Sequence, residues 1–198
     1  MRIVSIQTIA GGTGVTTIAT EKISAAVMDR KRVLAIDFGN NQMLEKMISG
    51  WHFTHLGDAL SLFCRERQPH WHTMQSLPSK CLLRLPKERW AYDRCDRSAL
   101  LEKFGHETLA HAQLRLQANL VSLGKHFDVC VVDLSKAHHH LMDMFIELSV
   151  ELHFCERLNT GVADFADYKD RFLSRLTPLP GQTMFKQADR GNSQQCMD

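Results

Sequence analysis

A glycine-rich stretch near the amino terminus constrains this chain more than any other feature. It reads Ile-Ala-Gly-Gly-Thr-Gly-Val-Thr-Thr over residues 9–17, follows a mostly apolar run at residues 3–6, and precedes a helix-like segment that ends at Met28. A strand that leads through such a turn into a helix is typical of a phosphate-binding loop. Glycines allow the tight turn, and the first N–H groups of the helix point at the anion. The sequence therefore predicts a phosphate cradle here.

The residues expected to contact a nucleotide follow from this loop. Thr16 lies where such loops place the hydroxyl that binds Mg²⁺, whereas Val15 replaces the lysine that normally precedes it. The cradle thus keeps its backbone donors and loses its strongest cationic side chain. The candidate nucleotide-binding residues are Gly11, Gly12, Thr13, Gly14, Val15, Thr16 and Thr17.

Two aspartates end apolar, strand-like segments later in the chain. Asp37 closes residues 33–37, and Asp133 closes residues 127–133. Because the carboxyl ends of parallel strands meet at one edge of a sheet, both acids are expected beside Thr16, where the three side chains would bind Mg²⁺. An alternative stays open, in which each aspartate only caps the turn after its strand.

Alternating strand-like and helix-like segments predict an α/β fold with a mainly parallel sheet between two helical layers. The first strand, the loop, the first helix and the second strand form a right-handed crossover. We expect one domain over residues 1–176, a loop-rich region over residues 51–78, and a polar, disordered or loosely attached tail over residues 177–198. The predicted strands are 2–8, 33–37, 81–85, 127–133 and 150–154, and the predicted helices are 18–28, 42–48, 98–123, 141–148 and 164–176.

Composition argues against several classes of function. A formal net charge of +2 creates no strong field for nucleic acid, so no nucleic-acid partner is expected. No apolar run approaches the roughly 20 residues that a transmembrane helix needs. The six cysteines show no CxxC spacing, which favours a reducing cytoplasm over a disulfide framework, and Cys130 is expected to be a small buried hydrophobe.

These elements together resemble the MinD/ParA family of P-loop ATPases, which implies a three-layer P-loop NTPase fold of the SIMIBI/MinD type. The loop of that family reads Lys-Gly-Gly-x-Gly-Lys-Thr-Thr, and here Ala10 and Val15 replace the two lysines in a degenerate Walker A motif. Asp37 matches the first acid of the family's Asp-x-Asp strand end, Gly39 replaces the second, and Asp133 ends a strand similar to Walker B.

Within the family, residues 36–44 are similar to the cellulose-biosynthesis accessory (BcsQ-type) branch. The resemblance implies ATP or ADP with Mg²⁺ as cofactors. It implies a homodimer, or a heterodimer with a small accessory protein, that contacts an inner-membrane synthase complex from the cytoplasm. The missing lysines and Gly39 imply weak or absent ATPase activity. Two alternatives remain: an active MinD/ParA-type ATPase that positions cellular cargo, and a scaffold that binds no nucleotide.

Three further features keep two interpretations each. The histidines at 138–140 suggest a metal site or a solvated helix start, and adjacent side chains on a helix point in different directions. The aromatic stretch at 51–71 is either a partner surface or loop packing. The apolar stripe from Phe165 to Leu176 is either a membrane-surface helix or the side that packs on the sheet.

Overall fold

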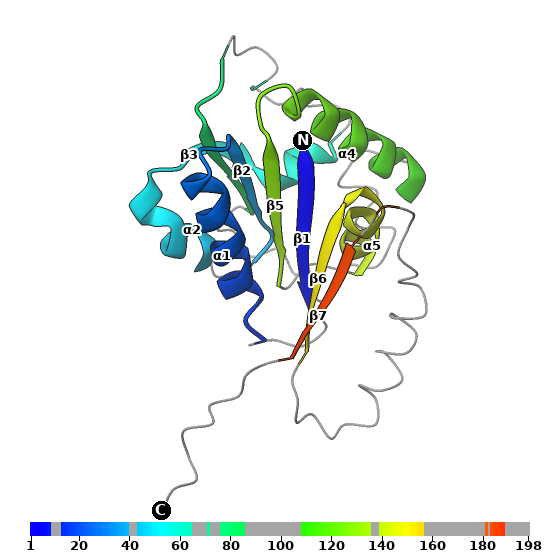
Figure 1. The fold of residues 1–198 in the computed structure, drawn as a ribbon. Helices are drawn as coiled ribbons and strands as arrows, with labels where there is room; N and C mark the ends of the chain where they lie inside the picture. The colour runs from blue at the N-terminus through cyan, green and yellow to red at the C-terminus, as the bar shows by residue number, and fades with distance from the viewer. Residues whose placement is uncertain are drawn as a thin grey trace, which may run out of the picture.

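All seven described strands join one parallel sheet, in the order β3-β4-β2-β5-β1-β6-β7 (Figure 1). The computed structural model describes residues 1–8, 13–39, 43–64, 71, 76–85, 108–135, 139–156, 181 and 183–188. The strands are β1 (Arg2–Thr8), β2 (Val33–Asp37), β3 (Thr54–Asp58), β4 (Lys80–Arg84), β5 (Val129–Leu134), β6 (Glu151–Glu156) and β7 (Thr183–Ala188).

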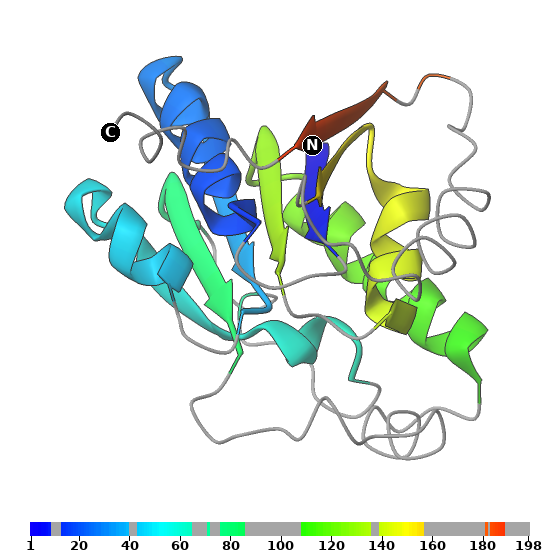
Figure 2. The same ribbon diagram turned by 90° about the horizontal axis from the view of Figure 1, so that it is seen from below.

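Helices cover both faces of the sheet, which confirms the predicted three-layer α/β architecture. Seen along the strands in Figure 2, α1 and α2 lie on one face, and α4, α5 and the short η2 lie on the other. The helical elements are α1 (Val15–Met28), α2 (Met43–Ile48), η1 (Ser49–Trp51), η2 (Ala59–Leu62), α4 (Leu109–Leu123) and α5 (His139–Leu148).

The core is divided between these two faces because successive strand residues point to opposite sides. On β2, Ala35 packs towards α1 and α2, whereas Leu34 and Ile36 pack towards α4 and η2. Strands that are covered on both faces are apolar almost throughout, and for this reason β1, β2 and β5 could be predicted from the sequence. Cys130 of β5 is fully buried among these apolar residues, as expected.

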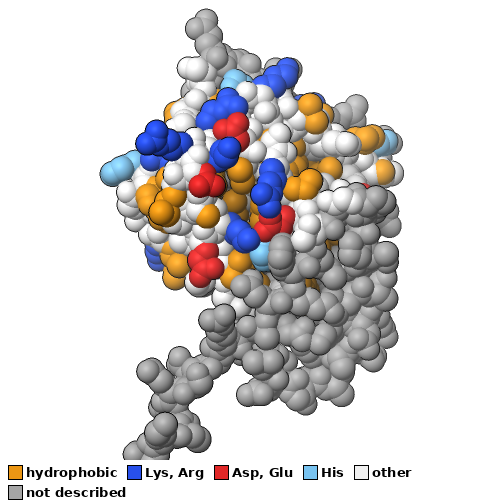
Figure 3. All heavy atoms as spheres, viewed as in Figure 1, with side chains coloured by type: hydrophobic (Ala, Val, Ile, Leu, Met, Phe, Trp, Pro, Cys, Tyr) orange, Lys and Arg blue, Asp and Glu red, His pale blue; other side chains and the backbone are white. Residues whose placement is uncertain are grey.

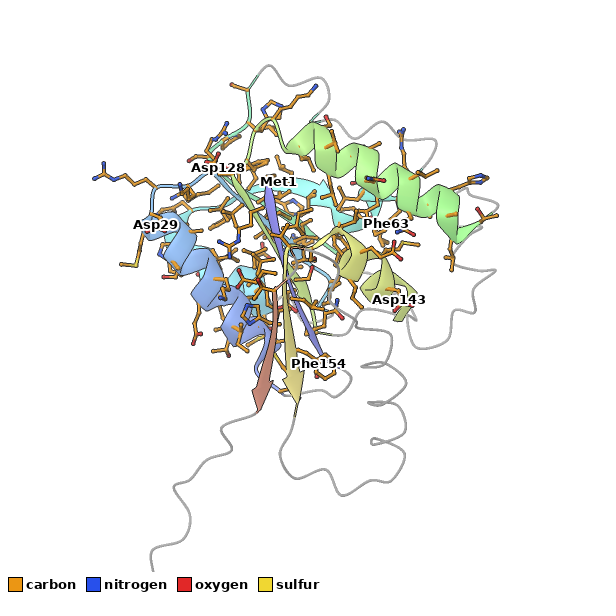
Figure 4. All side chains as sticks on the ribbon, turned by 45° about the vertical axis from the view of Figure 1, so that its right-hand side comes forward. Met1, Asp29, Phe63, Asp128, Asp143 and Phe154 are labelled. Carbon is orange, nitrogen blue, oxygen red and sulfur yellow. The ribbon has the colours of Figure 1, made fainter. Side chains whose placement is uncertain are left out.

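Three phenylalanines brace the carboxyl edge of the sheet on the α4 and α5 face. The ring centroid of Phe38, the residue after β2, lies 5.6 Å from that of Phe145 and 6.2 Å from that of Phe63. Figure 4 marks Phe63 beneath this helical layer. Edge-to-face and tilted contacts of this kind stabilise a core beyond the area they bury. These contacts fix the turn after β2 from the α4 and α5 face of the sheet.

The aromatic stretch at 51–71 is partly core. Phe63 and Trp71 are buried, and this favours the packing interpretation for both side chains. The same region contains β3, where we expected only loops. An edge strand needs no continuous apolar run, and β3 carries just one buried side chain, Leu56. Its parallel pairing with β4 is a tertiary contact that local sequence does not reveal.

The carboxyl-terminal prediction is wrong for residues 183–188. These residues form β7, which pairs in parallel with the whole of β6. Backbone hydrogen bonds to the edge of β6 form this strand, and they require no apolar periodicity in the sequence. The predicted helix at 164–176 and the rest of the tail lie outside the described residues. No helix in the described part of the chain is long and apolar enough to span a membrane.

A buried acid ties β6 to β1 and α1. Glu151, at the start of β6, is only 4% exposed and forms ion pairs with Arg2 and with Lys22, the latter at 2.7 Å. His153 Nε2 lies 2.7 Å from the same carboxyl group. Burial alone would raise the pKa of Glu151, but hydrogen bonds from Lys22 and His153 and the charges of Lys22 and Arg2 lower it to about 2.

We predict that Glu151 makes the free energy of unfolding depend on pH. Its pKa is depressed in the folded state, so its contribution is complete above the ordinary carboxyl range and is lost as the pH falls towards about 2. Glu151→Gln should lower the free energy of unfolding at neutral pH by about 1–3 kcal/mol. Urea unfolding from neutral to acidic pH measures this. A wild type and variant that differ equally at every pH would contradict the prediction.

A second prediction concerns β7. Deleting residues 182–198 should lower the melting temperature by several degrees, because the backbone groups of β6 lose their ladder partner. In a chain of this size about 1 kcal/mol corresponds to about 2–4 °C. Deleting only residues 189–198 is the matched control, because it keeps β7. Equal melting temperatures for the two deletions would show that β7 adds nothing to stability.

Candidate functional site

The start of α1 has the geometry of an anion-binding turn. Gly14 caps the helix with φ of 82°, a left-handed conformation that favours glycine, and its carbonyl accepts the first helical hydrogen bond from Ile18 N–H at 3.0 Å. Gly14 has no side chain to cap the helix, and an uncapped helix start is suited to binding an anion. Gly11 and Gly12 lie outside the described residues.

The four side chains after this turn differ in environment. Thr13 and Val15 are buried, Thr16 is half-buried, and Thr17 is exposed. Val15 is only 3% exposed and belongs to the apolar core under α1. A lysine in this loop would contact the phosphates, whereas the Val15 side chain packs into the core. Valine at position 15 therefore removes a positive charge from the loop and adds a buried apolar side chain to the core.

The two predicted acids lie side by side. Asp37 of β2 and Asp133 of β5 are register partners on neighbouring strands, and both are almost completely buried. The Thr16 hydroxyl is close enough to lower the pKa of Asp133 by hydrogen bonding. The structure thus brings together Thr16, Asp37 and Asp133, as expected from a parallel sheet.

Each of these carboxylates uses one oxygen for the turn that follows its strand. Oδ1 of Asp37 accepts the Gly39 N–H at 2.7 Å, and Oδ1 of Asp133 accepts the Ser135 N–H at 2.9 Å. Oδ2 of both residues is buried and has no hydrogen-bond partner among the described residues. The turn-capping interpretation is correct for the first oxygen of each acid and does not account for the second.

The pKa values of the pair reflect this unusual environment. Burial first, and then the charge of Asp133, raise the pKa of Asp37 to about 7, although the amides of Gly39 and Glu45 oppose the shift. Burial also raises the pKa of Asp133, against hydrogen bonds from Thr16 and Ser135. Two neighbouring buried carboxylates cannot both ionise cheaply, so the pair favours a bound proton or a bound cation.

Gly39 has a structural reason to be glycine. A Cβ atom at this position would lie 2.9 Å from Asp37 Oδ1 and 3.1 Å from Ser135 Oγ. The first distance is too short for real contacts, and the Asp37 carboxylate is held there by its own hydrogen bond. A larger residue at position 39 would therefore require the Asp37 carboxylate or the Ser135 hydroxyl to shift.

An arginine that the sequence analysis missed lies next in this row. Arg84, the last residue of β4, is the register partner of Asp37. It forms an ion pair with Glu45 of α2, and its Nε donates to His55 Nε2 at 3.0 Å. A signal existed, because Arg84 ends an apolar strand just as Asp37 and Asp133 do.

Oxygen donors of this kind fit Mg²⁺. Magnesium prefers carboxylate and hydroxyl oxygens together with phosphate and water. Asp37 and Asp133 are register partners, the Thr16 hydroxyl acts on Asp133, and the Oδ2 atom of each acid has no hydrogen-bond partner among the described residues. For the histidines at 138–140, α5 begins at His139, and their side chains lie outside the described part of the structure, so both interpretations stay open.

The fold is that of the MinD/ParA-type P-loop ATPases. A ParA family ATPase from Chlorobium tepidum TLS superposes with a TM-score of 0.59 and 19% sequence identity, covering 94% of this chain and 72% of that one. The MinD cell division protein of Aquifex aeolicus gives a TM-score of 0.54 and 15% identity, covering 95% and 69%. No protein-family model and no curated protein matches the sequence.

A metabolic enzyme shares the same fold. The cobyrinic acid a,c-diamide synthase of Mycobacterium smegmatis, solved with a bound ATP analogue and magnesium, superposes with a TM-score of 0.63 at 15% identity, covering 95% of this chain and 72% of that enzyme. Identities this low establish the common fold and leave the function to the site itself.

The burial of Val15 leads to a prediction. Val15→Lys should lower the free energy of unfolding by about 2 kcal/mol or more, because the ammonium group must be buried or must force the side chain out of the core. Thr17→Lys places the same residue on the exposed side and should be nearly neutral. Chemical denaturation measures both. A stable Val15→Lys protein that binds ATP more tightly would show that position 15 reaches the phosphates after all.

Proposed function

We propose that this chain binds a nucleoside triphosphate together with Mg²⁺ at the carboxyl edge of its sheet. The observation that carries the proposal is the pair of buried Oδ2 atoms of Asp37 and Asp133, in register on neighbouring strands and without a hydrogen-bond partner among the described residues. Turn capping alone accounts for one oxygen of each residue. A cation accounts for both remaining oxygens and offsets the cost of burying two acids.

Each part of the site would then have a distinct role. The Thr16 hydroxyl, Asp37 and Asp133 would hold Mg²⁺ or its water ligands, and the amides at the start of α1 would bind phosphate oxygens. The bound Mg²⁺ would supply positive charge to the phosphates. Gly14 allows the backbone to turn at this point without steric cost.

Fast hydrolysis does not fit these residues. Phosphoryl transfer requires cations placed in advance around the developing charge, and Val15 offers an apolar side chain that is packed in the core. Gly39 supplies no second acid at the position where the resembling family carries one. We therefore infer a weak or absent ATPase, in which bound nucleotide regulates contacts with other proteins.

For the biological setting, we propose an accessory subunit of a bacterial cellulose or exopolysaccharide synthesis and secretion system. The support is the resemblance of residues 36–44 to the cellulose-biosynthesis accessory branch. The chain would act from the cytoplasm, peripherally at the inner membrane, as a homodimer or with a small accessory protein. On the face shown in Figure 3, acidic and basic side chains are interspersed, which suits protein contacts better than nucleic acid.

A second candidate is an active ATPase that positions cellular cargo. It is favoured by the fold, because the similar structures include a plasmid partition protein and the MinD cell division protein. Measurable steady-state hydrolysis that depends on Thr16 would favour this candidate. A third candidate is a scaffold protein that binds no nucleotide, which requires that ATP does not bind.

Isothermal titration with ATP, with and without Mg²⁺, tests the proposed site. Binding should depend on Mg²⁺, and Asp133→Asn should abolish that dependence. Asp128→Asn is the matched control, because Asp128 precedes the same strand at its opposite end and is paired with Arg32 (Figure 4). Since the pKa of Asp37 is about 7, protons compete with Mg²⁺, and affinity should increase as the pH rises through neutrality.

The same titration has clear contrary outcomes. If the wild-type chain binds no ATP at any Mg²⁺ concentration, the scaffold reading is correct. If Asp133→Asn and Asp128→Asn bind equally well, the paired carboxylates do not hold the cation.

Without ligand, the free energy of unfolding should fall as the pH rises through about 7, because the raised pKa of Asp37 means that the folded state holds the extra proton.

A further inference from the structure

The carboxyl edge of the sheet carries a row of charges that extends beyond the acid pair. Asp37 and Arg84 end β2 and β4, Asp133 is the next-to-last residue of β5, and Asp37 is the register partner of both other residues. Neighbouring strands lie about 4.8 Å apart, so the Arg84 backbone is one strand spacing from Asp37. An arginine side chain is long enough to span that distance.

All three side chains of this row point to the same face. Two residues earlier on each strand, Val131, Ala35 and Leu82 pack into the core under α1 and α2. Because side chains alternate along a strand, Asp133, Asp37 and Arg84 point to that face as well. The amino ends of α1 and α2 border this part of the edge: Thr16 of α1 acts on Asp133, and the Glu45 amide of α2 acts on Asp37. Arg84 therefore faces the region where the phosphates are proposed to lie.

The present contacts of Arg84 can be exchanged at low cost. Its Nη1 pairs with Glu45, and its Nε donates to His55, whereas Nη2 has no hydrogen-bond partner within the described part of the chain. The side chains of Arg84 and Glu45 are 22% and 36% exposed. Ion pairs with this much solvent access contribute little net stability, so a stronger anion can replace the carboxylate.

Three of the described cations near this sheet already pair with acidic side chains. Lys22 and Arg2 pair with the buried Glu151, and Arg32 pairs with Asp128 at the amino end of the strands. Position 15, where a lysine would be expected, is filled by a buried valine. The charge that a triphosphate requires must then come from another element than the loop.

We propose that Arg84 is the side-chain cation for the phosphates of the bound nucleotide and that it exchanges Glu45 for a phosphate oxygen on binding. The inference rests on the proposed nucleotide site. A guanidinium group presents several N–H donors in one plane and matches two oxygens of one phosphate. Arg84 would thereby replace, from a different strand, the lysine that the loop lacks, and it would couple nucleotide binding to α2 through Glu45.

Isothermal titration with MgATP and with AMP tests this assignment. Arg84→Gln should weaken MgATP binding about tenfold or more, the effect of one lost charge-assisted hydrogen bond, and should affect AMP less because fewer phosphate oxygens are present. Glu45→Gln should leave MgATP affinity unchanged or increase it, because the competing carboxylate is removed. Arg32→Gln removes one positive charge at the opposite end of the sheet and is the matched control.

The different outcomes expected for Arg84→Gln and Glu45→Gln distinguish a role in binding from a structural role. If both variants weaken MgATP equally, or if Arg84→Gln binds like the wild type, the proposal is wrong and the ion pair is a structural tie. Should Arg84→Gln unfold, Arg84→Lys keeps the charge without the planar fork and should give an intermediate affinity. A wild type that binds no MgATP overturns the proposed function itself, whereas normal binding by Arg84→Gln overturns only the role of Arg84.

Discussion

The parallel pairing of β2 with β5 is the interaction on which the rest of the site depends. Its register sets Asp37 directly beside Asp133, and the pairing of β5 with β1 places the start of α1 next to the same edge. A shift of one residue on either strand would turn an acid to the opposite face and bring an apolar side chain to the site. The cores on both faces prevent such a shift, so the packing of the whole domain supports the geometry of two carboxylates.

Burying two neighbouring acids opposes folding, and hydrogen bonds from the backbone compensate only part of this cost. Backbone amides of Gly39 and Ser135 satisfy one oxygen of each residue. The pKa of Asp37 is nevertheless raised to about 7, by burial first and then by the charge of Asp133. A purely structural turn would be built more cheaply with asparagine or serine. Retaining both carboxylates in a buried position is more easily understood if they bind a cation.

The same edge combines features that favour binding with features that oppose fast chemistry. The turn at Gly14 and the uncapped start of α1 suit an anion, while Val15 has become part of the core. Gly39 contributes no further acid to this edge. Positive charge is present one strand beyond the acids, at Arg84, where it is paired with the helix that follows β2. Such a distribution is better suited to sensing a nucleotide and reporting it through α2 than to rapid turnover.

The sequence by itself determined the order of the main elements and the grouping of three candidate site residues. Apolar runs that are buried on both faces, a glycine turn and two strand-ending aspartates are local signals, so β1, α1, β2 and β5 and the grouping of Thr16, Asp37 and Asp133 could be predicted. Tertiary structure alone decided the rest. β3 pairs with β4, and β7 pairs with β6. These pairings, the inward orientation of Val15 and the position of Arg84 beside Asp37 depend on contacts between segments distant in sequence. Periodicity reports whether a side chain is to be buried, but strand order and register decide which residues meet at an edge, and these emerge only when the two faces of the sheet are packed together.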